Sequence, residues 1–157
     1  MSTKDTKQDN IIFINGKQKG LQALFSQENF GYLALGYNQS NDTNGFVNVE
    51  DGQEAPANGF YEISKEQDST YQRVPLYLIQ DSNAIIRNYD NGEVTVKFMA
   101  EFDIDNIVSG VTINQLAIVD SADPEDLDTT FYAAATCDDN FNKSEQLAIV
   151  FIIEMTI

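Results

Sequence analysis

The sequence predicts a mainly β protein, an antiparallel β-sandwich of jelly-roll-like type with one short N-terminal helix. The first observation is that four β-type runs follow one another with no helix between them: Glu93–Ile104, Val111–Ser121, Phe131–Cys137 and Glu145–Ile157. Short polar turns separate these runs, which is typical of antiparallel sheets. The second is that apolar and polar residues alternate along the first run, interrupted only by Met99. That period indicates a strand with one face on the core and one on water.

The N-terminal part supplies the helix and one strand. The short apolar run Asn10–Asn15 predicts a strand, and Tyr32–Leu35 predicts another that ends before a glycine. Between them, the segment Lys17–Phe25 has helical spacing. Three of its apolar residues would share one helix face: Leu21, Leu24 and Phe25.

The middle of the chain contains three short β-type pieces, at Phe60–Ile63, Gln72–Gln80 and Ala84–Asn88. Pro75 lies inside the second piece and predicts an edge strand or a bulge, because proline cannot donate to a ladder. The tetrapeptide Tyr89–Gly92 ends in Asn-Gly, the pair that suits the positive φ angles of hairpin turns. We therefore expect a hairpin at this point.

The closing run differs from the others because it is apolar on both faces. One face holds Leu147, Ile149, Phe151, Ile153, Met155 and Ile157, and the other holds Ala148, Val150 and Ile152. Such a pattern favours a central strand covered on both sides. The alternative is an exposed apolar face that packs on another subunit.

Domain organisation follows from length and composition. A chain of 157 residues with 42% hydrophobic content is expected to form one domain with a substantial core. Residues 1–10 are expected to form a flexible polar tail without the apolar region of a signal peptide. Residues 11–157 are expected to form the domain, with a long Asn-, Asp- and Gly-rich loop or arm at 37–59. Phe46 and Val49 are candidate anchors within that arm.

Charge and composition restrict the functional classes. The chain has 25 acidic and 9 basic residues and no histidine, which gives a formal net charge of −16. We expect no nucleic-acid partner, because nucleic-acid binding depends on Lys and Arg. Without histidine there is no Ser-His-Asp or Cys-His unit, and Cys137 is expected to be a packed, neutral thiol. We therefore predict a non-enzymatic protein with no catalytic, cofactor-binding or metal-binding residues and no membrane partner.

Two acidic loops, at 38–51 and 120–128, are the candidate cation sites. The first places Ser40, Asp42 and Asn44 before Gly45, at offsets similar to those of a calcium loop, but no helices flank it. The second gathers five carboxylates between two predicted strands, which is also the composition of an ordinary solvated turn. A calcium-dependent or carbohydrate-binding module therefore remains an alternative function.

Several short motifs follow one another in order along the chain. A glycine-plus-leucine helix leads to an LALG strand end, an acidic residue precedes an arginine-centred strand, and an alanine-rich strand comes near the end. These motifs are Gly20–Leu24, Phe30–Gly36, Tyr61–Ile63, Tyr71–Leu76, Val96–Phe102, Ile113–Asp120 and Phe131–Thr136. As an ordered set they resemble a family of small tailed-phage virion proteins that includes collar-fibre and fibre-anchoring modules. Gln115 departs from the pattern, which often has an acid at that position.

The resemblance implies a structural role in a virus particle that is assembled in the host cytoplasm. Its most specific form is an auxiliary (decoration) protein on the outer capsid surface, with the major capsid protein as partner. The alternative is a collar or tail adaptor, or a fibre-anchoring module, with portal, collar or fibre proteins as partners. Both imply many copies per particle, and the chain itself is a possible homo-oligomer.

Overall fold

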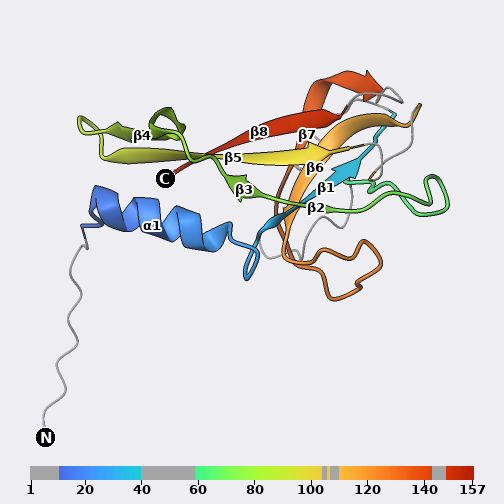
Figure 1. Ribbon diagram of the computed structural model, residues 1–157, viewed down its shortest axis with the longest axis horizontal. Helices are drawn as coiled ribbons and strands as arrows, with labels where there is room; N and C mark the ends of the chain where they lie inside the picture. Colours follow the sequence, from blue (N-terminus) through green and yellow to red (C-terminus); the bar gives the residue numbers. More distant parts are fainter. Residues whose placement is uncertain (1–10, 40–58, 104–105, 107–109, 143–147) are drawn as a thin grey trace, which may run out of the picture.

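The computed structural model shows two antiparallel β-sheets and one helix (Figure 1). It describes residues 11–39, 59–103, 106, 110–142 and 148–157. This architecture confirms the mainly β, sandwich-like fold with a helix near the N-terminus. No helix in the described part of the chain is long and apolar enough to cross a membrane.

The first sheet has the strand order β2-β1-β6-β7. These strands are β1 (Tyr32–Gly36), β2 (Val74–Pro75), β6 (Thr112–Val119) and β7 (Phe131–Asn142). Pro75 lies on β2, at the edge of this sheet, as a residue without an N–H donor should.

The second sheet is built around β5 (Glu93–Phe102), which pairs with each of the other strands of this sheet. They are β3 (Tyr77–Leu78), β4 (Ile85–Asn88) and β8 (Ile149–Thr156), and a 3₁₀ turn, η1 (Ser82–Ala84), precedes β4. The alternation in β5 is confirmed, because Val94, Val96, Phe98, Ala100 and Phe102 are all buried. Asn91-Gly92 forms the predicted β4–β5 turn, with Gly92 at φ +72°.

The predicted strand Gln72–Gln80 divides between the two sheets. It contributes β2 to one sheet and β3 to the other, and Leu76 lies at the crossing with its N–H donating to the Gly31 carbonyl over 2.8 Å. Strands that change sheets in this way make the corners of a sandwich. The two sheets are therefore joined by continuous chain at this point.

Helix α1 (Ile14–Leu24) covers part of the second sheet (Figure 1). Leu21 and Phe25 are buried, and the Phe25 ring meets those of Phe98 and Tyr132 edge-on, with centroids 5.5 and 5.0 Å away. At the other end of the helix, Lys17 Nζ donates to the Gly92 carbonyl over 2.7 Å. The helix is thus held between the aromatic core and the β4–β5 turn.

The predicted strand at Asn10–Asn15 is wrong where the structure describes it. Ile14 begins the helix, because it falls on the same helix face as Leu21 and packs against the core. Ile11, Ile12 and Phe13 precede the helix, belong to no strand and are exposed.

Candidate protein-binding site

Strand β8 is an edge strand, not the central strand that its apolar sequence favours. Among the described strands it pairs with β5 alone. Val94 and Ile157 exchange two backbone hydrogen bonds of 3.0 Å. In an antiparallel pair, hydrogen-bonded and non-hydrogen-bonded residue pairs alternate, so the backbones of Lys97 and Glu154, and those of Met99 and Ile152, do not bond each other. The N–H and C=O groups of Ile152 and Glu154 therefore point away from β5, toward the open side of the strand.

The second sheet is one strand narrower than the first. Because β8 pairs along one side of β5, β3 and β4 share the other side, opposite Phe98–Met99 and Glu93–Val96 respectively. The second sheet is thus three strands wide in the described part of the chain, whereas the first is four. No described strand lies beyond β8 on the side where β8 and β7 residues face each other.

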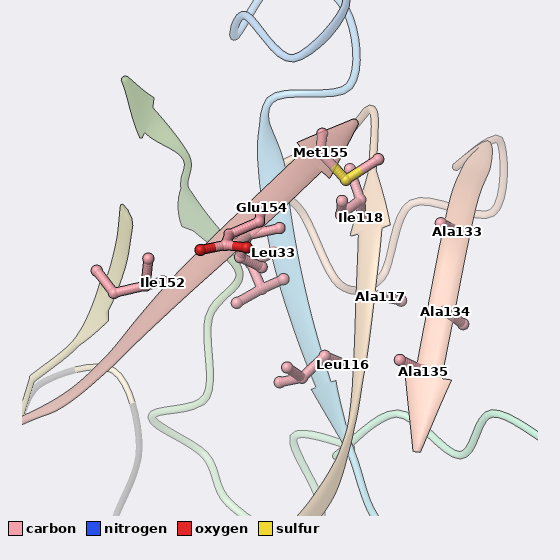
Figure 2. A pocket seen from close by; sticks show the side chains of 11 residues that line it. Leu33, Leu116, Ala117, Ile118, Ala133, Ala134, Ala135, Ile152, Glu154 and Met155 are labelled. Carbon is pink, nitrogen blue, oxygen red and sulfur yellow. The ribbon is translucent and has the colours of Figure 1, made fainter. Parts of the chain in front are cut away.

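An apolar cleft of about 310 Å³ lies at this position (Figure 2). The second sheet lines it with residues of β8, and the first sheet with residues of β1, β6 and β7. Its walls are Leu33, Leu116, Ala117, Ile118, Ala133, Ala134, Ala135, Ile152, Ile153, Glu154 and Met155. Ala133 and Ala135 are exposed although they pair with Ile118 and Leu116, whose side chains lie in or against the core.

Aromatic contacts flank the cleft at both ends. Near the start of β8, the Phe141 and Phe151 rings meet edge-on with centroids 6.3 Å apart. Near the start of β7, the Tyr132 ring contacts those of Phe25 and Phe30. The open part of the strand edge is therefore short, about Ile152 to Thr156.

This arrangement can bind an extended peptide by strand addition. The open edge offers backbone donors and acceptors, and the cleft offers an apolar surface for alternate side chains. On the outer face of β8, Val150 and Ile152 are 49% and 55% exposed. No described segment covers this outer face of β8, and its packing on another chain stays a prediction.

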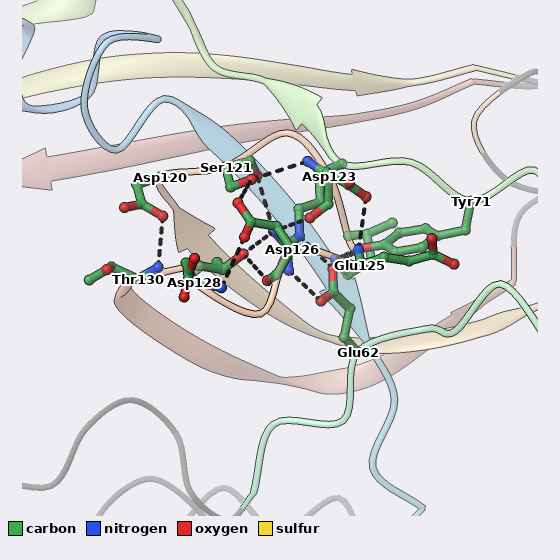
Figure 3. Close-up of polar contacts among 12 residues, drawn as sticks. Glu62, Tyr71, Asp120, Ser121, Asp123, Glu125, Asp126, Asp128 and Thr130 are labelled. Carbon is green, nitrogen blue, oxygen red and sulfur yellow. Dashed lines mark hydrogen bonds and ion pairs between the residues drawn. The ribbon is translucent and has the colours of Figure 1, made fainter.

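A second cluster joins the residues of the arginine-centred motif (Figure 3). Arg73 donates from Nε and Nη2 to the two Glu62 carboxylate oxygens, each over 2.8 Å. Tyr71 Oη donates to the same carboxylate over 2.5 Å and accepts from the Leu35 N–H over 3.0 Å. Burial first, and then the Glu62 charge, raise the pKa of Tyr71 well above its ordinary value.

Arg73 also fixes the acidic loop 120–128. Its Nη1 donates to the carbonyls of Ser121 and Asp123 and to Thr129 Oγ1, over 3.1, 2.9 and 2.8 Å. Burial by itself lowers the pKa of Arg73, but the Glu62 hydrogen bonds and charge outweigh it and raise that pKa. The guanidinium therefore stays charged and holds the loop in place.

The carboxylates of this loop bind the loop itself. Asp120 accepts from the Thr130 N–H, Asp123 from the Glu125 N–H, and Asp126 from the Asp128 N–H and the Ser121 hydroxyl (Figure 3). The Ser121 hydrogen bond and the Asp128 N–H lower the pKa of Asp126. These contacts are those of a folded turn. Among the described residues, no three Cys, Asp or Glu side chains are grouped to hold a metal ion.

The other sequence-based candidates have mixed outcomes. Most of the acidic loop 38–51, with Phe46 and Val49, lies outside the described residues. Cys137 is half-buried on β7. Gln115 is buried, and its side chain accepts from the Tyr61 N–H over 2.9 Å and donates to the Gly59 carbonyl. An amide can do both, whereas a carboxylate cannot donate, which gives a structural reason for glutamine at this position.

The cleft residues of β7 were not identified from the sequence. Small side chains suit a strand that is tightly packed against large neighbours as well as a strand that is left open. The available signal was the combination of small residues at 133–135 with a terminal strand that is apolar on both faces.

Comparisons of the chain with protein-family models, curated proteins and solved structures find no match.

Proposed function

We propose that this chain is a non-catalytic structural protein of a tailed-phage particle that joins its neighbours through the open edge of β8. In its most specific form it is an auxiliary protein on the outer capsid surface, bound to the major capsid protein. The observation that carries the proposal is the cleft between β8 and β7, whose apolar walls no described strand covers. Such an edge binds an extended segment by shape and backbone pairing.

Two further observations support a structural role. The motifs that carry the family resemblance lie mainly on the framework of the sandwich, in β1, β5, β6 and β7. The resemblance therefore concerns the scaffold, which is the part that a structural protein contributes. The net charge of −16 is suited to a surface that does not contact nucleic acid.

A collar or tail adaptor, or a fibre-anchoring module, is the alternative within the same class. Portal, collar or fibre proteins would be the partners at that position. Copy number separates the two positions, because a decoration protein is present in proportion to the major capsid protein and an adaptor in proportion to the portal.

The test is quantitative mass spectrometry of purified particles of the virus that encodes this chain, with wild type and two variants. Ile152→Pro removes an N–H that points to the open side and leaves the β5–β8 ladder bonds in place. Ile152→Val keeps that N–H and is the matched control. We expect wild type and Ile152→Val in multi-copy amounts and loss of Ile152→Pro from the particles.

Circular dichroism and thermal unfolding show whether Ile152→Pro is folded. Absence of the wild-type chain from particles that contain the other virion proteins would overturn the proposal. Incorporation of folded Ile152→Pro at the wild-type level would show that the β8 edge is not the contact.

A further inference from the structure

We infer that the open strand position beside β8 receives the extended segment Ile11–Phe13 of a second copy of this chain. The inference rests on the proposed role of the β8 edge as a strand-binding site, and it names the partner at that site. It joins two features of the same chain that lack a counterpart in the described structure: an edge without a strand and an apolar segment without a sheet.

The donor segment has the properties of an unpaired strand. Ile11, Ile12 and Phe13 are 82%, 62% and 77% exposed, although all three are large and apolar. Phe13 has an extended backbone, with φ −73° and ψ 153°. The three residues pair with no described strand. Consecutive exposed residues of this kind mark a contact surface.

The acceptor matches this segment in size. Ala133 and Ala135 present only methyl groups on the inner face of β7, which leaves room for large side chains from the opposite layer. Packed interiors pair small residues with large ones in this way. The branched and aromatic side chains of Ile11 and Phe13 would fill space that the alanines leave.

The two elements also match in pattern. In an added strand, Ile11 and Phe13 point to one face and Ile12 to the other. In the open part of β8, Ile153 and Met155 point inward, and Ile152 points outward on the same face as Glu154 and Thr156. A donor strand is therefore complementary to β8 on its inner face and, with Ile12 beside Ile152, at one position of its outer face.

The length of the opening favours a short segment over a second copy of β8. The open edge extends over about five residues before the Phe141–Phe151 contact. In the described residues the second sheet is narrower than the first by one strand, whereas a second copy of β8 would bring its whole sheet with it. Ile11–Phe13 is a single unpaired segment at the start of α1, and thus fits without that sheet.

In this structure the segment does not occupy the cleft of its own chain. None of its residues lines the cleft, and Lys17 holds the first turn of α1 at the β4–β5 turn. A second copy can supply the segment without moving that helix.

The experiment measures self-association of the full chain by sedimentation and by light scattering after gel filtration. The donor variant is Ile11→Asp/Phe13→Asp, and the acceptor variant is Ile152→Pro. Tyr89→Asp is the matched control, because Tyr89 has the same exposed fraction as Phe13, 77%, on the β4–β5 turn. We expect wild type and Tyr89→Asp to associate with rising concentration.

Each of the two site variants should weaken self-association by roughly 30-fold or more, the size of a central interface contact. Mixing the two variants is the decisive step. The acceptor variant still has an intact segment and the donor variant an intact edge, so the mixture should form a one-to-one dimer with the wild-type dissociation constant.

Three outcomes would overturn the inference. These are a wild-type chain that stays monomeric at all concentrations, donor variants that associate normally, and a mixture that does not form the dimer. If donor variants enter particles at the wild-type level while Ile152→Pro does not, the β8 edge remains the binding site and a different protein supplies the strand.

Discussion

Arg73 lies just before β2 and links two separate segments of the chain, the one that contains Glu62 and the acidic loop 120–128. Its side chain is 2% exposed, and that of its partner Glu62 is 17% exposed. Removing one partner of a buried ion pair leaves the other charge without compensation. The family resemblance drew attention to both residues, but their pairing was not predicted, because ten residues of irregular chain separate them and only the folded loop brings them together.

We expect Arg73→Met to lower the free energy of unfolding by about 3–5 kcal/mol, measured by urea denaturation. The matched control is Lys97→Met, which breaks the partly exposed Lys97–Glu154 pair of 3.3 Å and should cost less than about 1 kcal/mol. A double variant, Glu62→Gln/Arg73→Met, should recover part of the loss, since it removes the uncompensated carboxylate. Equal costs for Arg73→Met and Lys97→Met would contradict this account.

Tyr71 predicts a dependence of stability on alkaline pH. Its pKa in the folded chain is raised above its ordinary value of about 10. The contribution of Tyr71 to the free energy of unfolding is complete below a pH of about 10. It is lost as the pH rises further, because the unfolded chain then releases a proton that the folded chain keeps. Each such proton gives a slope of about 1.4 kcal/mol per pH unit.

Urea denaturation of wild type and Tyr71→Phe across this alkaline range measures the effect. The variant should be less stable near neutral pH, because it loses the hydrogen bonds to Glu62 and Leu35. Its stability should then fall less steeply above pH of about 10. Tyr89→Phe controls for removal of one exposed phenol. Parallel curves for wild type and Tyr71→Phe would refute the role of this group.

Among the elements, those with a strong local signal were predicted from the sequence. The β4–β5 hairpin follows from Asn91-Gly92, and β5 follows from its period of two. The place of β8 was not predictable, because burial on both sides and binding to another chain require the same apolar residues. The strand predicted at Asn10–Asn15 failed because Ile14 belongs equally well to the buried face of a helix.

Two glycines test this account of the elements with effects of opposite sign. Gly20 lies inside α1 with nothing within 4 Å of an added Cβ, so Gly20→Ala should stabilise the protein by about 0.5–1 kcal/mol. Gly92 has φ +72°, where a side chain is strained, so Gly92→Ala should destabilise it by about 1–2 kcal/mol. Thermal and urea unfolding of both variants provide the measurement. Effects of the same sign would be inconsistent with the assigned conformations.

For the whole molecule, the sequence predicted a sandwich but not the difference in width between its two sheets as the described residues form them. Hydrophobic pattern indicates which segments are extended, whereas the width of each sheet depends on how β3 and β4 share one side of β5. This pairing of distant segments is set by the folded chain. The open edge is therefore a property of the topology. The position of Ala133–Ala135 beside that edge could be identified only once the pairing of the two sheets was known.

The net charge of −16 predicts how self-association responds to salt. Two copies repel each other, and salt screens that repulsion while the apolar contact in the cleft is unaffected. Raising sodium chloride from about 20 mM to about 300 mM should therefore tighten association, because the screening length falls below about 10 Å. Sedimentation of the wild-type chain at both concentrations measures this. Weaker association at high salt would indicate a contact dominated by opposite charges.

The separation between Ile11–Phe13 and the β8 edge has a geometric consequence. A donor and an acceptor at different places on one molecule make a head-to-tail contact, which lacks the twofold symmetry of an ordinary dimer. Each added copy then brings a fresh acceptor, so the series ends only when a rotation closes it into a ring. An open series grows into a filament, and the angle between successive copies decides between these two forms.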